Sequence, residues 1–301
     1  MESYIICVDG GGTKTSAVAY DSLGNELSNF QGGFGNLTVN VEEALTNIEY
    51  AIKGAMISLR NLKCIHICVG LAGVEVGKNK EIVKDFLEKI FNVSVTVVND
   101  AYLALNASLK GQDGILVISG TGSIAYGKYK NEVARTGGWG HILGDEGSGY
   151  DIVKKAFKQM TLDKDDNKDM SNLTAVLLDK INAKNIPEAM DYVYKKNKGE
   201  LASLVPVIAN IANESDKDAV KILNEAGIEL AELCLKSYKS LNINEDIKVA
   251  IKGSILTKVQ IVRDSFVKEL KNNLIKFSII DDNEPSTKGG YYIFKNLNKE
   301  F

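Results

Sequence analysis

The chain has 301 residues, of which 45% are hydrophobic and 25% charged, as in an ordinary globular protein of about two domains. A net charge of −3 argues against a general nucleic-acid surface, and no apolar run approaches the ~20 residues that a membrane span needs. The first residues show no basic, apolar leader, and the four cysteines make no disulfide framework. We therefore expect a cytoplasmic protein with neither a nucleic-acid nor a membrane partner.

The predicted elements change in character near residue 148. Of the 27 glycines, 22 lie in residues 1–150, where short apolar runs bounded by glycine predict strands. In chain order we expect strands at 5–8, 15–20 and 26–30, a helix at 41–59, a strand at 65–71, a helix at 78–91, a strand at 93–98, a helix at 101–109 and strands at 115–118, 124–127 and 131–133. We then expect helices at 149–160, 171–182, 187–195, 199–212 and 216–241, a strand at 247–251, a helix at 259–274, a strand at 277–280 and a last helix from about 285.

One pattern occurs twice, about 110 residues apart: an apolar strand, a turn of glycine and threonine, and a second strand. The first copy begins with Ile5–Thr13 and the second with Ile115–Ser123. A duplicated unit of this kind predicts two similar domains.

The two glycine turns are candidate anion sites. Gly-Gly-Gly-Thr-Lys-Thr at 10–15 and Ser-Gly-Thr-Gly-Ser at 119–123 would present backbone N–H groups, hydroxyls and the Lys14 charge to a phosphate. The hydroxyls belong to Thr13, Thr15, Thr121 and Ser123. Neither turn is a Walker A loop or a dinucleotide fingerprint. The glycines could instead only close tight hairpins, but their equivalent places in a duplicated unit favour phosphate binding.

Two aspartates follow predicted strands. Asp9 lies beside the first glycine turn, where its carboxylate could hold Mg²⁺ through water or accept N–H bonds within the turn. Asp100 lies between the strand at 93–98 and the next helix. It could be the N-cap of that helix, or a general base that takes a proton from a hydroxyl as it attacks phosphorus.

The glycine-rich segment 137–148 contains the only tryptophan of the chain. Trp139 offers a flat apolar face, and Asp145 and Glu146 can accept hydrogen bonds from the paired hydroxyls of a sugar. The alternative is a structural loop that caps the helix near residue 149. The segment is the candidate sugar-binding loop.

Histidine and cysteine are expected to be structural in the strand at 65–71. We expect His66 to be a satisfied core residue, and the spacing of four between Cys64 and Cys68 predicts both thiols on one face of a strand. Since no further cysteine pair is near, we expect buried thiols and no zinc site.

Four segments together resemble the N-acetylglucosamine kinases of the BadF/BadG-type ATPase family, which has the actin, Hsp70 and sugar-kinase fold. These segments are Asp9–Thr15, Asn99–Ala101, Ser119–Ser123 and Gly138–Ser148. The resemblance covers residues 4–150 in order. After the strand at 247–251, Gly253-Ser254 resembles the family's adenosine-side motif more weakly.

The resemblance implies an α/β fold of two duplicated, ribonuclease H-like domains around a nucleotide cleft. We expect an N-terminal actin-like ATPase domain at 1–110 and a C-terminal actin-like domain with a helical insertion at 111–301. Whether the last helix packs back on the N-terminal domain is left open.

The resemblance also implies a reaction, the transfer of phosphate from ATP with Mg²⁺ to the 6-hydroxyl of N-acetylglucosamine. N-acetylmuramic acid, as in the salvage of cell-wall sugars, and a homodimer are left open. Asp100 would be the base, and Asp9 would hold Mg²⁺ through water. The ATP-binding residues would be Asp9, Gly10, Gly11, Gly12, Thr13, Lys14, Thr15, Gly120, Thr121, Gly122, Ser123, Gly253 and Ser254. The sugar-binding residues would be Asn36, Asp100, Ser123, Gly138, Trp139, Gly140 and Asp145.

Three other functions remain to be weighed. An ATPase that activates a dehydratase or reductase partner through an iron–sulfur cluster would need exposed cysteine ligands, which Cys64 and Cys68 do not resemble. An Hsp70- or actin-like binding protein would need a peptide domain or filament surfaces, and 301 residues leave no separate peptide domain. A sugar kinase of the zinc-binding lineage would need a cysteine cluster that this sequence lacks.

Overall fold

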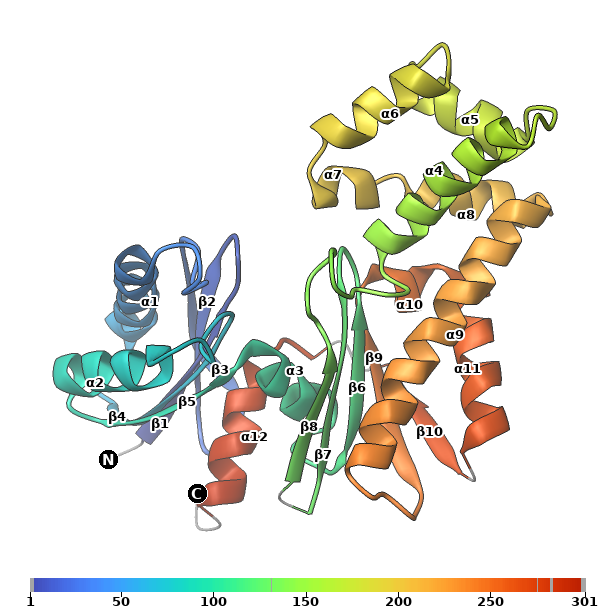
Figure 1. Cartoon of the computed structure of the whole chain (residues 1–301). Helices are drawn as coiled ribbons and strands as arrows, with labels where there is room; N and C mark the ends of the chain where they lie inside the picture. The colour runs from blue at the N-terminus through green and yellow to red at the C-terminus, as the bar shows by residue number, and fades with distance from the viewer. Residues whose placement is uncertain (1–2, 131, 275, 282–283, 299–301) are drawn as a thin grey trace. The chain divides into compact units, whose positions relative to one another are not determined.

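The computed structural model describes residues 3–130, 132–274, 276–281 and 284–298; Asn131, predicted in a strand, lies outside them. The chain divides into two compact units (Figure 1). Unit 1 comprises Met1–Gln112 with Asp282–Phe301, and unit 2 comprises Asp113–Asp281. Each unit contains a five-stranded mixed sheet with helices, which confirms the predicted two-domain α/β class.

Unit 1 is a sheet with helices on both faces. Its elements are β1 (Ser3–Gly10), β2 (Thr15–Tyr20), β3 (Glu26–Gly32), α1 (Val41–Met56), η1 (Ile57–Leu59), β4 (Lys63–Leu71), α2 (Asn79–Phe91), β5 (Ser94–Asn99), α3 (Asp100–Ser108) and α12 (Lys288–Leu297). The strand order is β3-β2-β1-β4-β5, with β1, β4 and β5 parallel and β2 and β3 antiparallel. The helices α1 and α2 cover one face, and α3 and α12 cover the other (Figure 1). Because β1 is buried on both faces, its sequence is a continuous apolar run.

The last helix packs in unit 1, far from its neighbours in sequence. The Tyr20 hydroxyl lies 2.9 Å from the Thr287 hydroxyl, just before α12 begins. A side chain at Gly289 would overlap the carbonyl oxygen of Leu103 on α3, and one at Gly290 would meet the Cys7 thiol on β1. The two glycines therefore let the α12 backbone come close to both α3 and the sheet.

The prediction that Cys64 and Cys68 share one face of their strand is wrong. The register of β1 and β4 shifts at Ile5, so that one residue of β4 is unpaired there. As a result Cys64 packs with the core under α1 and α2, whereas Cys68 packs with Cys7 in the core under α12. Burial raises the pKa of Cys64 to about 11 and that of Cys68 to about 12, so both are inert thiols.

His66, on the same strand, is a satisfied core residue as predicted. Its Nδ1 lies 2.7 Å from the Ser94 hydroxyl and its Nε2 lies 3.0 Å from the Thr96 hydroxyl. The ring stacks on Phe294 of α12. Burial lowers the pKa of His66 to about 4, so the imidazole is neutral at pH 7.

Unit 2 repeats the sheet of unit 1 and adds a helical segment. Its elements are β6 (Gly114–Ser119), β7 (Ser123–Tyr129), β8 (Glu132–Gly137), α4 (Gly149–Asp165), α5 (Asn172–Lys180), α6 (Ile186–Lys195), α7 (Lys198–Ala202), α8 (Val205–Asn213), α9 (Lys217–Ser240), β9 (Ile247–Lys252), α10 (Ser254–Lys258), α11 (Gln260–Asn273) and β10 (Phe277–Ile280). The order β8-β7-β6-β9-β10, with β6, β9 and β10 parallel, matches that of unit 1 strand for strand. The predicted duplication is confirmed.

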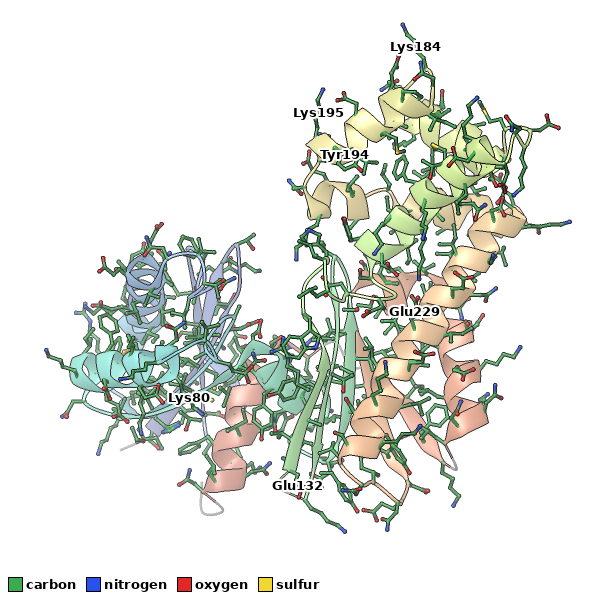
Figure 2. All side chains as sticks on the ribbon, in the orientation of Figure 1. Lys80, Glu132, Lys184, Tyr194, Lys195 and Glu229 are labelled. Atoms are coloured by element: carbon green, nitrogen blue, oxygen red, sulfur yellow. The ribbon has the colours of Figure 1, made fainter. Side chains whose placement is uncertain are left out.

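The helices of unit 2 differ from prediction in two places. The helix expected at 199–212 is divided into α7 and α8, and Pro206 lies in the first turn of α8, where its missing N–H costs no hydrogen bond. A short helix, α10, precedes the helix expected at 259–274. Lys184, just before α6, and Tyr194 and Lys195, at the end of α6, point into solvent (Figure 2). In the part of the chain that the structure describes, no helix is long and apolar enough to cross a membrane.

Candidate active site

The predicted phosphate turn of unit 1 joins β1 to β2. The Gly11 N–H donates to the Lys14 carbonyl over 3.0 Å, which leaves Gly12, Thr13 and Lys14 exposed at the tip. Gly10 is held beneath the tip, because a side chain there would meet Leu71 and the Gly35 backbone. The tip can therefore offer backbone N–H groups and one ammonium to an anion.

Thr15 differs from the other residues of this turn. Its side chain is fully buried, and its hydroxyl has no hydrogen-bond partner among the described residues. A Cβ placed on Gly35 would lie 2.6 Å from that hydroxyl, so Thr15 faces the loop before Asn36 and not the exposed tip. The sequence did not predict this orientation.

The sheet of unit 1 brings three candidate residues to one edge. Asp9, the next-to-last residue of β1, lies opposite Gly70 of β4, and Asn99, before Asp100, is opposite Leu71. Since the carboxyl ends of parallel strands meet at the same sheet edge and strands lie ~5 Å apart, Asp9 and Asp100 are two strands, or roughly 10 Å, apart. Asn36 joins this edge because Leu37 N–H donates to the Ala72 carbonyl just beyond β4.

The side chains of Asn36 and Asp100 are held by different local hydrogen bonds. The Asn36 side-chain oxygen accepts from both the N–H and the hydroxyl of Thr38, so its amide group is held in place. The N-cap of α3 is Asn99 and not Asp100, which contradicts the N-cap alternative for Asp100. Asp100 is the first residue of α3; its Oδ1 accepts from the Ala101 N–H over 2.9 Å, and its side chain is half-buried. A carboxylate in the first turn of a helix interacts favourably with the helix dipole.

The phosphate turn of unit 2 joins β6 to β7 and contacts the start of α4. The Gly120 N–H donates to the Gly122 carbonyl, and the Gly149 N–H donates to the Gly120 carbonyl over 2.7 Å. Thr121 is exposed, whereas Ser123 is buried and donates its hydroxyl to the Glu146 carbonyl. Gly253, with φ of +89°, lies so close to Ser119 that no side chain would fit, which places Ser254 beside this turn.

The candidate sugar-binding loop, 137–148, presents an apolar tip and a buried carboxylate. Trp139 is 66% exposed, and Ile142 and Leu143 beside it are exposed as well. Asp145 is only 4% exposed, and its Oδ1 accepts from the Ser123 N–H over 3.3 Å. The Asp145 carboxylate therefore also contacts the phosphate turn, which the sequence did not predict.

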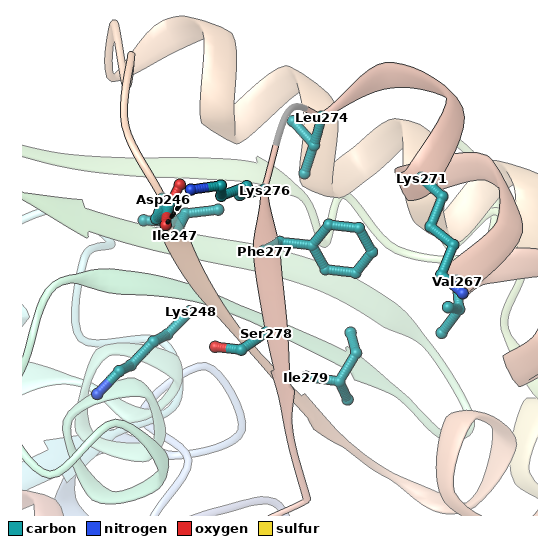
Figure 3. A pocket seen from close by; sticks show the side chains of 10 residues that line it. All are labelled: Asp246, Ile247, Lys248, Val267, Lys271, Leu274, Lys276, Phe277, Ser278 and Ile279. Atoms are coloured by element: carbon teal, nitrogen blue, oxygen red, sulfur yellow. Dashed lines mark ion pairs between the residues drawn. The ribbon is translucent and has the colours of Figure 1, made fainter.

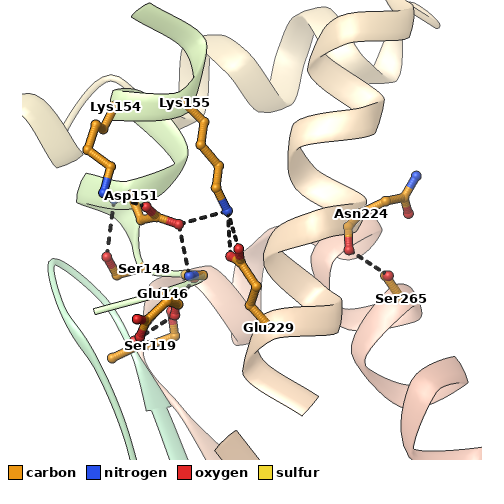
Figure 4. A network of polar contacts seen from close by, with 11 residues as sticks. Ser119, Glu146, Ser148, Asp151, Lys154, Lys155, Asn224, Glu229 and Ser265 are labelled. Carbon is orange, nitrogen blue, oxygen red and sulfur yellow. Dashed lines mark hydrogen bonds and ion pairs between the residues drawn. The ribbon is translucent and has the colours of Figure 1, made fainter. Parts of the chain in front are cut away.

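A partly buried ionic network holds the end of this loop (Figure 4). Asp151 Oδ2 accepts from the Gly147 N–H and pairs with Lys155 over 2.9 Å. Lys155 also meets both carboxylate oxygens of Glu229, on α9, at 2.5 Å. The Ser119 hydroxyl donates to the Gly147 carbonyl, so both the backbone N–H and the backbone C=O of Gly147 are fixed. The network thus connects α9 and α4 to the loop and to the end of β6.

A pocket of about 590 Å³ in unit 2 contains part of the predicted phosphate site and extends beyond it. Gly120, Thr121, Gly149 and Ser254 line one part of it. The other part is lined by α7, α8, α10 and the residues that directly follow α7 and α10. These lining residues are Gly199, Ala202, Ser203, Val205, Pro206, Ala209, Asn210, Asn213, Ile255, Lys258 and Val259. Sequence reasoning missed these residues; small side chains before a helix-starting proline were the only available signal.

A second hollow, of about 650 Å³, contains none of the predicted site residues (Figure 3). It lies along the edge strand β10, between Lys248, Lys271 and Phe277.

Among the described residues, no three His, Cys, Asp or Glu side chains are grouped as metal ligands. A metal held mainly by water and phosphate oxygens, as Mg²⁺ usually is, needs no such group.

Comparisons with known proteins identify the family of the chain. The model of the BadF/BadG/BcrA/BcrD ATPase family matches residues 6–290. The chain is 33% identical to an N-acetylmuramic acid/N-acetylglucosamine kinase of Clostridium acetobutylicum, over 97% of this chain and 98% of that one. It is 29% identical to an N-acetyl-D-glucosamine kinase of Dictyostelium discoideum, over 98% of each.

A solved structure is similar over nearly the full length. It is that of a Chromobacterium violaceum protein with a provisional name of N-acetylglucosamine kinase, with a TM-score of 0.72 and 25% identity over 96% of this chain and 98% of that one. The predicted resemblance is confirmed: the chain belongs to the BadF/BadG/BcrA/BcrD ATPase family.

Proposed function

We propose that the protein is an ATP-dependent kinase that phosphorylates the 6-hydroxyl of N-acetylglucosamine and of N-acetylmuramic acid. The observation that carries the proposal is the sheet edge of unit 1, where the Gly10–Thr13 turn, Asn36 and Asp100 are gathered. An anion-binding turn next to a carboxylate that could act as a base is what phosphoryl transfer to a hydroxyl requires. The full-length similarity to amino-sugar kinases supports the choice of acceptor.

In the proposed reaction, the Asp100 carboxylate accepts the proton of the sugar 6-hydroxyl as its oxygen attacks the γ-phosphorus of ATP. The bond from that oxygen to phosphorus forms, the bond from the γ-phosphorus to the bridging oxygen breaks, and ADP leaves. Mg²⁺, held at Asp9 through water, would neutralise the phosphate charge. The N–H groups of the exposed residues Gly12 and Thr13 would bind phosphate oxygens.

The pocket of unit 2 fits the remainder of ATP. Its volume of about 590 Å³ is in the range of small-molecule sites. We propose that Gly120 and Thr121 contact phosphate, with Gly253 and Ser254 beside them, and that the base lies against Pro206 and Ala209. Asn210 and Asn213 offer amide donors and acceptors for its polar edge.

For the sugar, the proposal assigns Asn36 and Asp100 in unit 1 and Gly138, Trp139, Gly140 and Asp145 in unit 2. Trp139 offers an exposed apolar face, and Asp145 offers a charged acceptor to hydroxyl groups. Since the Ser123 hydroxyl is already bonded to the Glu146 carbonyl, we propose that Ser123 acts through its place in the turn. The cytoplasmic location and the homodimer stay predictions.

The test is a panel of acceptors with γ-labelled ATP: N-acetylglucosamine, N-acetylmuramic acid, glucosamine, glucose and 6-deoxy-N-acetylglucosamine. We expect labelled product from the first two and none from the 6-deoxy sugar. ATP hydrolysis that no sugar accelerates and that yields no phosphosugar would contradict the proposal and favour an ATPase that activates a dehydratase or reductase partner. The three thiols of unit 1 give that alternative no support, because Cys7 and Cys68 are fully buried and Cys64 lies on the other face of the sheet.

A further inference from the structure

Arg135 occupies an unusual position beside the candidate sugar-binding loop. Of the 36 basic residues of the chain, only three are arginines: Arg60, Arg135 and Arg263. The Arg135 guanidinium lies over the ring of Trp139, the only tryptophan, with its central carbon 4.7 Å from the ring centroid. Its Nη2 donates to the Gly138 carbonyl over 2.7 Å. The guanidinium is thus held in one orientation by the loop that the proposed function assigns to the sugar.

The strand β8 determines which face Arg135 occupies. The Thr136 hydroxyl meets the Ser237 hydroxyl of α9, so Thr136 points to the α9 face of the sheet. Because side chains alternate along a strand, Arg135 points to the opposite face, where its side chain is exposed. It is therefore accessible to a bound small molecule.

The charge of Arg135 exceeds what a neutral sugar requires. Hydroxyl groups are satisfied by neutral or anionic acceptors, and the loop already supplies Asp145 and Glu146. A guanidinium has five N–H donors in a planar fork that matches the two oxygens of a carboxylate, which a lysine ammonium does not. An arginine whose guanidinium lies over the tryptophan ring is thus suited to an acidic group on the sugar.

We propose that Arg135 determines specificity for amino sugars that carry a carboxylate, by pairing with the acidic substituent of a sugar bound at Trp139. N-acetylmuramic acid, whose lactyl ether ends in a carboxylate, is the member of this class that tests the idea. The inference rests on the proposed function, since it needs the sugar to bind at this loop. The competing explanation is that Arg135 only stiffens Trp139, which would affect acidic and neutral sugars alike.

The experiment compares kcat/KM for N-acetylmuramic acid and N-acetylglucosamine in the wild type, Arg135→Gln and Arg135→Lys. We expect Arg135→Gln to lower the ratio of the acidic to the neutral sugar roughly 10- to 100-fold, as for the loss of a charge-assisted pair. Arg135→Lys should restore part of the ratio, because it keeps the charge and loses the fork. Lys130→Gln is the matched control, since Lys130 lies 4.8 Å from the Tyr129 ring centroid at the distal hairpin of β7 and β8, and it should leave the ratio unchanged.

Binding provides a second readout that does not depend on turnover. Trp139 is the only tryptophan, so its fluorescence reports each sugar directly. The Kd of N-acetylmuramic acid should rise in Arg135→Gln by a factor similar to that in the kinetic ratio, and it should rise with salt in the wild type.

Each outcome decides between the two proposals. Equal effects of Arg135→Gln on both sugars would overturn the role of Arg135 and leave the proposed kinase intact. A wild type that phosphorylates N-acetylglucosamine but not N-acetylmuramic acid would overturn the role of Arg135 and the second acceptor of the proposed function, and would leave an N-acetylglucosamine kinase. A wild type that phosphorylates neither sugar would overturn the proposed function, and this inference with it.

Discussion

Replacing Lys155 by Met should destabilise the protein, because it leaves two carboxylates without their shared cation. The Asp151 and Glu229 side chains are 6% and 28% exposed, and Lys155 itself is 22% exposed. Burial alone would raise the pKa of Asp151, but hydrogen bonds from Lys155 and Lys154 outweigh it and hold that pKa below its ordinary value. Burial raises the pKa of Glu229, and Lys155 opposes that change. Lys155 is therefore the cation that favours the ionised form of both carboxylates.

The size of the effect follows from this burial. Removing one partner of a buried ion pair typically costs about 3–5 kcal/mol, whereas an exposed pair contributes less than about 1 kcal/mol. Since Lys155 and Glu229 keep about a quarter of their exposure, we expect about 3 kcal/mol. That corresponds to a fall in Tm of roughly 6–12 °C for a domain of this size.

Scanning calorimetry and urea unfolding at pH 7 measure the loss. Lys154→Met is the matched control, because Lys154 also pairs with Asp151 at 2.9 Å but is 49% exposed, and it should cost less than about 1 kcal/mol. The depressed pKa of Asp151 contributes stability above its unfolded value of 3.8, and this contribution is lost as the pH falls below that value. The difference between wild type and Lys155→Met should therefore shrink in acid. Equal stability of the two lysine variants at pH 7 would refute the reasoning.

Three further perturbations are specific to single residues. Burial lowers the pKa of His66 to about 4, so His66 binds a proton more readily in the unfolded state than in the folded state. The free energy of unfolding of the wild type should therefore fall by roughly 3 kcal/mol as the pH drops from 6.5 to 4. In His66→Gln, urea unfolding should show that the midpoint loses most of this dependence on pH. Thr15→Val replaces a buried hydroxyl that has no hydrogen-bond partner among the described residues, so thermal unfolding should show equal or slightly higher stability and the activity should be kept. A tenfold loss of activity would instead assign that hydroxyl to ATP. Asp145→Asn removes the charge and keeps a residue type that tolerates the backbone φ of +64° at this position. Steady-state kinetics should show a KM for the sugar that is raised about tenfold or more and a KM for ATP that is nearly unchanged. The opposite pattern would assign Asp145 to the nucleotide.

The sheets could be predicted from the sequence because their signals are local. Ile5–Val8 and Ile115–Ile118 are apolar runs that end in glycine turns, and both became central strands. The unpaired residue in β4 leaves no mark in the sequence, so the faces of Cys64 and Cys68 were assigned wrongly. Asn99 and Asp100 are both good capping residues, and only the backbone conformation shows that Asn99 is the cap.

The candidate site was predictable where a turn is contiguous in sequence. Gly10–Thr13 and Gly120–Ser123 could be found by composition alone. The Arg135–Trp139 contact and the pocket wall on α7 and α8 depend on segments whose approach is set by tertiary packing. The same is true of the Asp145 contact with Ser123, which joins a loop to a turn 22 residues away.

The most direct test of the account is ³¹P NMR of wild type and Asp100→Asn with ATP, Mg²⁺ and N-acetylglucosamine. The asparagine keeps the size and the hydrogen bond to the Ala101 N–H but cannot accept the proton. We predict that the wild type forms ADP and a sugar 6-phosphate in equal amounts, and that Asp100→Asn binds ATP but turns over about 10²–10⁴-fold more slowly. Turnover of Asp100→Asn within a few-fold of the wild type, or wild-type ADP formation without a 6-phosphate, would contradict the account.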